Sequence, residues 1–178
     1  MDSYLHQLTA VILTYKTNLD ILKNCLKSIN PKVKILIVEN SSHFKYLKEI
    51  QSNFSNIEVI CSGSNLGYGG GNNFGLNKVK TNYALILNPD TVCEDNFFSN
   101  VNKYLSGNIN FTLIGATYSN KTDFKPAGFF NKKDLKDAQF DKESNLYEVD
   151  WIAGHTILFN MKKFSNKIFF DENFFLFF

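Results

Sequence analysis

Three short, continuous apolar runs restrict the fold more than any other feature of this sequence. They are LTAVILTY at 8–15, VKILIV at 33–38 and YALIL at 83–87, and a shorter run lies at 57–60. Runs without polar alternation are typical of strands buried on both faces, which occur in parallel sheets covered by helices. The sequence therefore predicts four buried strands, and each of them is followed by a polar turn.

Helical patterns separate these runs. Thr17 or Asn18 is a candidate N-cap for a helix with apolar residues at 19, 22, 26 and 29, which Asn30-Pro31 would end. Further helices are predicted over 44–54, through Leu76 and Val79 after a glycine-rich loop at 63–75, and over 94–105 with acidic residues in its first turn. This alternation predicts an α/β fold with a doubly wound, mostly parallel sheet flanked by helices.

The pattern changes after residue 111. A strand is predicted over 111–117, and another over 151–159, while 118–150 is polar and lysine-rich and suggests a long active-site segment or a hairpin. The length of 178 residues and the 44% hydrophobic content suit a single domain covering 1–178.

Charge and composition exclude several classes of protein. The formal net charge is +2 and there is no arginine, which argues against a nucleic-acid surface or a polybasic membrane surface. No segment reaches the ~20 apolar residues that span a bilayer, and no signal peptide is recognisable. Three widely spaced cysteines without metal-ligand spacing indicate reduced thiols and a cytoplasmic location.

Polar side chains follow each predicted buried strand. Right-handed crossovers place the carboxyl ends of parallel strands at one edge of the sheet, where ligands bind. Tyr15 could stack on a base, and Glu39 could accept hydrogen bonds from a base or a ribose, although both also suit ordinary surface positions. Asp90, in Asn88-Pro89-Asp90, could hold a divalent cation that bridges a diphosphate, or could belong to a plain turn that caps the next helix.

The glycine-rich segment at 67–73 has two interpretations. It could be a flexible turn before a helix, or a segment whose backbone amides approach a diphosphate, which a chain without arginine would need. A dinucleotide-binding fingerprint would follow the first strand rather than the third, which makes hydride transfer unlikely. Nucleotidyl transfer would need a basic glycine-rich loop after the first strand, and Lys16 alone does not provide one.

Taken in order, these segments resemble family-2 glycosyltransferases of the GT-A (Rossmann-like) fold. The matching segments are AVILTYKTN at 10–18, ILIVENSS at 35–42, NLGYGGGNNFGL at 65–76, LILNPDT at 85–91, WIAGHTILF at 151–159 and FFDENFFLFF at 169–178. The NPD sequence and the NxGxxxGxN pattern are similar to the bacterial rhamnosyltransferase-like branch. The resemblance covers essentially the whole chain, with 1–117 as the nucleotide-sugar donor half and 118–178 as an incomplete acceptor half.

The resemblance implies inverting transfer of a sugar, rhamnose being one candidate, from a nucleotide-diphosphate sugar to a hydroxyl of a polysaccharide or lipid-linked acceptor. The nucleotide-binding residues that it implies are Thr14, Tyr15, Glu39, Asn65, Gly67, Asn72 and Asn88. Asp90 would bind Mg²⁺ or Mn²⁺, and Trp151 and Gly154 would shape the acceptor side. Glu39 stands where the family usually has Asp, and Asn88 replaces the first carboxylate of the DxD pattern. Membrane contact would be at most peripheral, at the inner face.

The resemblance assigns no catalytic base to this sequence. In the family, the segment that matches 170–176 leads into an acidic pair that carries the general base, and here the sequence ends at Phe178. We therefore expect a truncated glycosyltransferase domain or, as the alternative, a catalytically inactive domain that binds a nucleotide sugar or a partner. We also expect the apolar residues 174–178 to dock as a strand or helix, or to mediate self-association.

Overall fold

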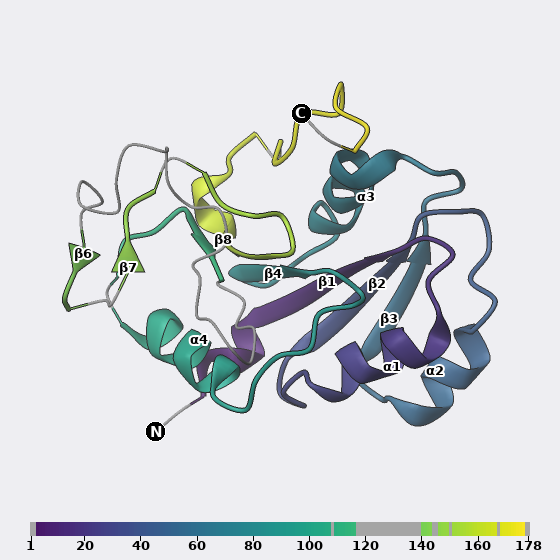
Figure 1. The fold of residues 1–178 in the computed structure, drawn as a ribbon, viewed down its shortest axis with the longest axis horizontal. Coiled ribbons are helices and arrows are strands. Elements are labelled where there is room, and N and C mark those ends of the chain that lie inside the picture. The colour runs from purple at the N-terminus through teal and green to yellow at the C-terminus, as the bar shows by residue number, and fades with distance from the viewer. Residues whose placement is uncertain are drawn as a thin grey trace, which may run out of the picture.

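A six-stranded mixed sheet forms the centre of the protein (Figure 1). The computed structural model describes residues 3–107, 109–116, 140–143, 146–149, 151–166 and 168–176. The strand order is β3-β2-β1-β4-β8-β5, in which β1 to β4 are parallel and β8 runs antiparallel to both of its neighbours. The strands are β1 (Leu8–Thr14), β2 (Lys34–Glu39), β3 (Ile57–Cys61), β4 (Tyr83–Leu87), β5 (Leu113–Gly115) and β8 (Thr156–Asn160). The predicted doubly wound, mostly parallel sheet is confirmed.

The helices divide between the two faces of this sheet. They are α1 (Leu19–Lys27), α2 (Leu47–Asn53), α3 (Gly67–Leu76) and α4 (Phe97–Ser106), with short 3₁₀ turns η1 (Tyr4–Gln7) and η2 (Met161–Lys163). Asn18 caps α1, because its side-chain oxygen accepts hydrogen bonds from the amides of Asp20 (2.8 Å) and Ile21 (3.3 Å). Among the described residues, no helix combines the length and the apolar character needed to cross a membrane.

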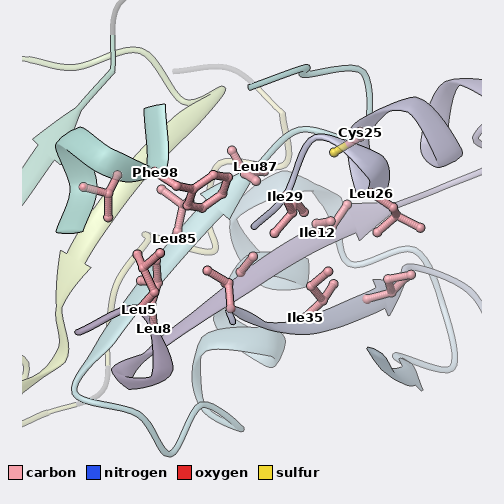
Figure 2. Packing of buried hydrophobic residues seen from close by; sticks show 14 of the residues in the cluster. Leu5, Leu8, Ile12, Cys25, Leu26, Ile29, Ile35, Leu85, Leu87 and Phe98 are labelled. Carbon is pink, nitrogen blue, oxygen red and sulfur yellow. The ribbon is translucent and has the colours of Figure 1, made fainter. Parts of the chain in front are cut away.

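Each face of the sheet has its own hydrophobic core. The larger core lies under α1, α2 and α4 and includes Leu8, Ile12 and Cys25, all fully buried (Figure 2). The smaller core lies under α3 and η2 and includes Val11 and Phe159. Successive residues of β1 therefore contribute to opposite cores, which explains why its sequence is apolar without alternation.

The order of the strands locates a switch point between β1 and β4. After β1, the chain adds β2 and then β3 on one side, with α1 and α2 on one face. Helix α3 then crosses the other face and returns the chain to β4, on the opposite side of β1. In open α/β sheets, ligands bind outside the carboxyl ends of the strands at such a point.

The glycine-rich segment is the main departure from the sequence-based expectation. Residues 67–75 do not form a loop but belong to helix α3, and only 63–66 remain a loop. A Cβ atom added to Gly75 would lie 2.6 Å from Val38 Cγ2, and one added to Gly71 would lie 2.5 Å from Leu13 Cδ1. The glycines therefore let α3 approach the strands closely, and this packing outweighs a cost in helix propensity of about 1 kcal/mol per glycine.

Several other elements are shorter than predicted: α2 begins at Leu47 rather than 44, β5 covers Leu113–Gly115 rather than 111–117, and α4 and β8 begin later than expected. Helix α4 begins at Phe97, so Glu94 precedes it and no acidic residue lies in its first turn. Residues 151–155 precede β8 rather than form part of it, although the His155 carbonyl still accepts a hydrogen bond from the Asn88 amide, in register with the β4–β8 pairing. Of the segment 118–150, the structure describes 140–143 and 146–149, where β6 (Phe140–Asp141) and β7 (Leu146–Tyr147) pair as a hairpin, and residues 118–139 lie outside the described part.

Candidate functional site

The carboxyl ends of β1, β2 and β3 meet in one row. Thr14 is paired in register with Glu39, and Glu39 with Cys61. On the other side of β1, Ile12 pairs with Leu87, so Asn88 begins the turn at the same edge. The sheet therefore brings together polar residues that are up to 74 positions apart in the sequence, as the parallel arrangement predicts.

Glu39 is the central charged residue of this edge. Its side chain is 7% exposed, and its carboxylate accepts hydrogen bonds of 2.7 Å from the hydroxyls of both Thr14 and Ser41. Burial of a charge is costly unless hydrogen bonds compensate for it. Here one hydroxyl orients each carboxylate oxygen, and each oxygen keeps a lone pair for another donor. The carboxylate is thus a preorganised acceptor of hydrogen bonds.

Asn40, next to Glu39, organises the loop that follows β3, a role not predicted from the sequence. Its side chain is 2% exposed, and its Nδ2 donates to Asn65 Oδ1 (2.9 Å) and to the Gly67 carbonyl (3.0 Å). Its Oδ1 accepts from the Leu66 amide (3.0 Å) and from Ser62 Oγ (3.2 Å). All the hydrogen-bonding capacity of this amide is used within the protein. Its position after a buried strand was visible in the sequence, but its partners were not.

The predicted donor-loop residues fall into two groups. Asn65 and Gly67 join the network around Asn40, and Gly67 has the positive φ of 73° that favours glycine. Asn72 instead lies fully buried in α3, where its Nδ2 donates to the Tyr68 carbonyl (3.0 Å). In the spacing NxGxxxGxN, the last asparagine is Asn73, and that spacing could have singled it out.

The first amides of α3 already have partners in the protein. The Gly67 amide donates to Asn65 Oδ1 (3.0 Å), and the Tyr68 amide donates to the Phe175 carbonyl (2.8 Å). The amides of a first helical turn lack partners within the helix and are the usual anion donors. These two amides of the glycine-rich segment are therefore committed to holding the chain together rather than free to bind a diphosphate.

The turn after β4 places Asn88 and Asp90 at the same edge. The Asn88 amide donates to the His155 carbonyl (2.9 Å), and the Asn88 carbonyl accepts from the Thr91 amide (3.0 Å). Asp90 is exposed, and its charge acts on His155: burial lowers the pKa of this histidine, and the charge of Asp90 partly opposes that effect. The structure thus brings Asp90 next to the segment before β8.

A dedicated metal centre is not found in the part of the chain that the structure describes, where no group of three or more His, Cys, Asp or Glu residues could hold an ion. A cation that binds chiefly to phosphate oxygens needs only one or two protein carboxylates. The exposed carboxylate of Asp90 fits such a cation.

Tyr68 joins the predicted acceptor side to α3. Its hydroxyl donates to the Gly154 carbonyl, and a Cβ atom added to Gly154 would lie 3.0 Å from that hydroxyl oxygen. Burial raises the pKa of Tyr68 to about 12, so it remains a donor at neutral pH. Trp151, three residues earlier, is 46% exposed. The sequence did not single out Tyr68, because its role depends on a contact 86 residues away.

The C-terminal segment docks on α3, but neither as a strand nor as a helix within the described residues. Asn73 Nδ2 donates to the Phe170 carbonyl (2.9 Å) and to Glu172 Oε1 (2.8 Å), and Asn73 Oδ1 accepts from the Phe170 amide (3.0 Å). The side chains of Phe174 and Phe175 remain about half exposed, at 49% and 58%. Docking therefore combines these hydrogen bonds with apolar packing, because Phe169 and Phe170 lie against the smaller core and the ring of Phe170 contacts that of Tyr68.

The sheet, its switch point and the polar edge define an α/β domain of the GT-A glycosyltransferase class. A mannosyltransferase from Pyrobaculum calidifontis, solved with GDP-Man and Mn²⁺, matches with a TM-score of 0.66 at 12% identity over 94% of this chain and 48% of that one. Residues 1–349 of S. aureus TarS match with a TM-score of 0.63 at 14% identity, over 93% of this chain and 50% of that one. These likenesses show the fold.

The chain belongs to glycosyl transferase family 2, because the sequence model of that family matches residues 9–169. A curated relative, the low-salt glycan biosynthesis hexosyltransferase Agl10 of Haloferax volcanii, is 29% identical over 99% of this chain and 60% of its own length. The chain thus spans about half to three fifths of the length of these proteins.

Proposed function

We propose that this domain binds a nucleotide-diphosphate sugar at the carboxyl edge of β1, β2 and β4 and transfers the sugar, with inversion, to a hydroxyl acceptor. The observation that carries the proposal is the pair of carboxylates on either side of β1: buried Glu39 at the end of β2 and exposed Asp90 after β4. The hydroxyls around Glu39 fix its carboxylate as an acceptor for a hydrogen-bond donor of the ligand. The exposed carboxylate of Asp90 is accessible to a cation. The family membership supports this assignment.

The β1–β2 side would hold the nucleoside. Glu39 would accept a hydrogen bond from a base N–H or a ribose hydroxyl, because its free lone pairs accept and cannot donate. Thr14, fully buried, orients that carboxylate. The ring of Tyr15, 44% exposed at the end of β1, would stack on the base, and Asn65 and Gly67 would line the adjacent loop.

The β4 side would hold the diphosphate through a divalent cation. Asp90, beside Asn88, would bind Mg²⁺ or Mn²⁺, and the neighbouring fold with GDP-Man and Mn²⁺ supports that choice of ion. When bound, the ion would neutralise the charge that develops on the leaving diphosphate. Trp151 and Gly154 would border the acceptor, and the contact between Tyr68 and Gly154 would fix that border relative to α3.

The general base is not assigned to any described residue. Glu172, the acidic residue nearest to α3 in the C-terminal segment, is engaged by Asn73 (2.8 Å). The resemblance assigns no general base to a residue of this sequence, so we assign no proton-transfer step to this chain. The acceptor that we propose is a polysaccharide or a lipid-linked intermediate reached from the cytoplasm, and the role of the curated relative in glycan biosynthesis supports it. Rhamnose as the donated sugar remains a prediction.

Calorimetric titration tests the donor site. The protein is titrated with GDP, UDP and dTDP, each with and without Mn²⁺, and the titrations are repeated with Asp90→Asn and with Asp95→Asn as the matched control. Asp95 is also exposed but lies five residues beyond the strand-end turn. We expect Mn²⁺-dependent binding of at least one nucleotide, weakened at least about ten-fold in Asp90→Asn, as for loss of a charge-assisted contact, and unchanged in Asp95→Asn.

Two results would contradict this assignment. Absence of binding for all three nucleotides, with and without Mn²⁺, would refute the donor site. If Asp90→Asn and the parent protein bind the nucleotide with equal affinity in Mn²⁺, the role of Asp90 is refuted. The proposed nucleoside site between β1 and β2 would not be affected by that result. Transfer itself is then measured as release of the nucleoside diphosphate from a sugar nucleotide whose base binds.

A further inference from the structure

A single peptide group, between Gly67 and Tyr68, joins the candidate donor site to the C-terminal segment. Its carbonyl accepts a hydrogen bond from Asn40 Nδ2 (3.0 Å), and its N–H donates to the Phe175 carbonyl (2.8 Å). Tyr68 is the second residue of α3, so its N–H has no partner within the helix. The protection of this amide therefore depends on Phe175.

On the donor side, the peptide is held by a residue that is itself tightly fixed. The Asn40 amide donates to the Thr14 carbonyl (2.7 Å), so Asn40 moves with the ends of β1 and β2. Its side chain also holds Asn65 and Leu66. A displacement at the edge where Glu39 lies would thus reach the first turn of α3 through Asn40.

On the other side, the backbone of the C-terminal segment lies directly against the first turns of α3. A Cβ atom added to Gly67 would lie 2.2 Å from the Phe175 carbonyl oxygen, and one added to Gly69 would lie 3.3 Å from the Asp171 carbonyl oxygen. Phe169 and Phe170 anchor the start of the segment against the smaller core. The side chains of 174–176 are largely exposed, so the part after Phe170 is held mainly by hydrogen bonds of Asn73 and of the Tyr68 amide. A part held by a few hydrogen bonds opens more readily than a packed core.

We propose that Asn40 is a positioning residue that couples the nucleotide site to the segment 168–176 through the Gly67–Tyr68 peptide. Hydrogen bonds on the two ends of one peptide group polarise each other, so the donation from Asn40 strengthens the N–H of Tyr68 as a donor to Phe175. The same donation fixes the plane of the peptide. The part of this inference that concerns nucleotides rests on the proposed function. By reciprocity, a ligand that fixes the β1–β2 edge tightens the segment, and the docked segment favours the ligand.

Hydrogen exchange of the protein without nucleotide tests the coupling directly. The variant Asn40→Asp keeps the size and one acceptor oxygen but removes the Nδ2 donor. The matched control is Asn56→Asp, since Asn56 Nδ2 also donates to a backbone carbonyl, that of Val33 (2.8 Å), before the first residues of β2. We expect exchange at the Tyr68 amide and in 168–176 to become about five- to ten-fold faster in Asn40→Asp, which loses the hydrogen bonds of Nδ2 to the Gly67 carbonyl and to Asn65, and to stay unchanged in Asn56→Asp.

Unchanged exchange of 168–176 in Asn40→Asp would overturn the inference, and so would an equal increase in both variants, which would indicate a general loss of stability. Exchange in β1 and β2 reports whether Asn40→Asp folds. If it does not, Asn65→Ala decides, because this exposed side chain accepts from both Asn40 Nδ2 and the Gly67 amide. Faster exchange at Tyr68 in Asn65→Ala would support the coupling, and parent-like exchange would overturn it.

A second arm adds GDP, UDP or dTDP with Mn²⁺ to the parent protein. We expect slower exchange in 168–176 with the nucleotide that binds, and a smaller effect in Asn40→Asp. A nucleotide that binds by calorimetry without slowing exchange in this segment would overturn the inference and leave the proposed function intact. If no nucleotide binds, the proposed function fails, and the exchange of the free protein still decides whether Asn40 positions the segment.

Discussion

Gly75 is the position where one methyl group should cost the most, because α3 lies against two strands there. A Cβ atom at this position would lie 2.6 Å from Val38 Cγ2 and 2.7 Å from Val11 Cγ1. Both valines are fully buried in adjacent central strands, and β-branched side chains have few alternative rotamers. The added methyl group can therefore be accommodated only if α3 moves away from the sheet.

The size of the effect follows from two opposing contributions. Overpacking of a well-packed core costs about 1–3 kcal/mol, and two simultaneous close contacts place Gly75→Ala near the upper end. Replacement of glycine by alanine within a helix returns about 1 kcal/mol. We expect a net loss of about 2 kcal/mol in the free energy of unfolding, which lowers Tm by about 4–8 °C for a chain of this length.

Urea denaturation measures this loss as a shift of the midpoint at constant m-value. The control is Gly70→Ala in the same helix, where the nearest atom, Leu66 Cβ, lies at 3.1 Å, so a shift of a few tenths of an ångström makes room for the methyl group. We expect the stability of Gly70→Ala to lie between that of the parent protein and about 1 kcal/mol above it, because the same gain in helix propensity applies without the clash against two valines. In a double-mutant cycle, Val38→Ala should recover about 1 kcal/mol of the Gly75→Ala loss. Parent-like stability of Gly75→Ala would refute the packing argument.

Three further predictions concern charged groups and thiols. Glu39→Gln should lower the free energy of unfolding by about 1–3 kcal/mol and weaken nucleotide binding. In the parent protein both carboxylate oxygens accept a hydrogen bond from a hydroxyl, and in the variant an amide N–H₂ would replace one of these acceptors. Denaturation measures the loss of stability, and calorimetry measures the loss of affinity. At pH 8, a thiol reagent should react rapidly with Cys61 alone, because burial raises the pKa of Cys25 to about 12 and that of Cys93 to about 11, and Cys61→Ser should abolish the fast phase. Burial lowers the pKa of His155 in the folded protein. As the pH falls, this histidine is therefore protonated in the unfolded chain before it is protonated in the folded one. Its contribution to stability is complete above pH 6.5 and is lost as the pH falls toward the folded pKa. His155→Gln should flatten that part of the stability-versus-pH curve, and an unchanged slope would contradict the assignment.

The buried strands could be predicted well because their signal is local. A strand covered on both faces needs an uninterrupted apolar run, and β4 has the predicted bounds of 83–87. The N-cap at Asn18 was also predictable, since a cap forms with amides two and three residues away. The boundaries of α4 and β8 were less accurate, because apolar and acidic residues that suit these elements continue beyond the points where the helix and the strand begin.

The candidate site was predictable only as an edge. Parallel strands bring their carboxyl ends together, so Thr14, Glu39 and Asn88 were expected at one side of the sheet, and they lie there. Asn40 and Asn73 were not singled out, because an asparagine in a sequence gives no sign of its partners. The partners of Asn73 are 97 and 99 residues away.

The sequence by itself determined the α/β class, the buried strands and the row of polar strand ends, because each depends on neighbouring residues or on a regular alternation of elements. Only the tertiary structure decided that the glycines of 67–75 form a helix. These glycines allow the backbone of α3 to lie close to Leu13, Val38 and Phe175. Those contacts exist only when the chain is folded. Glycine is a poor helix former in isolation, so local propensity indicated a loop. Contacts with the sheet and the C-terminal segment reversed that preference, and they also turned two asparagines into the residues that hold the site together.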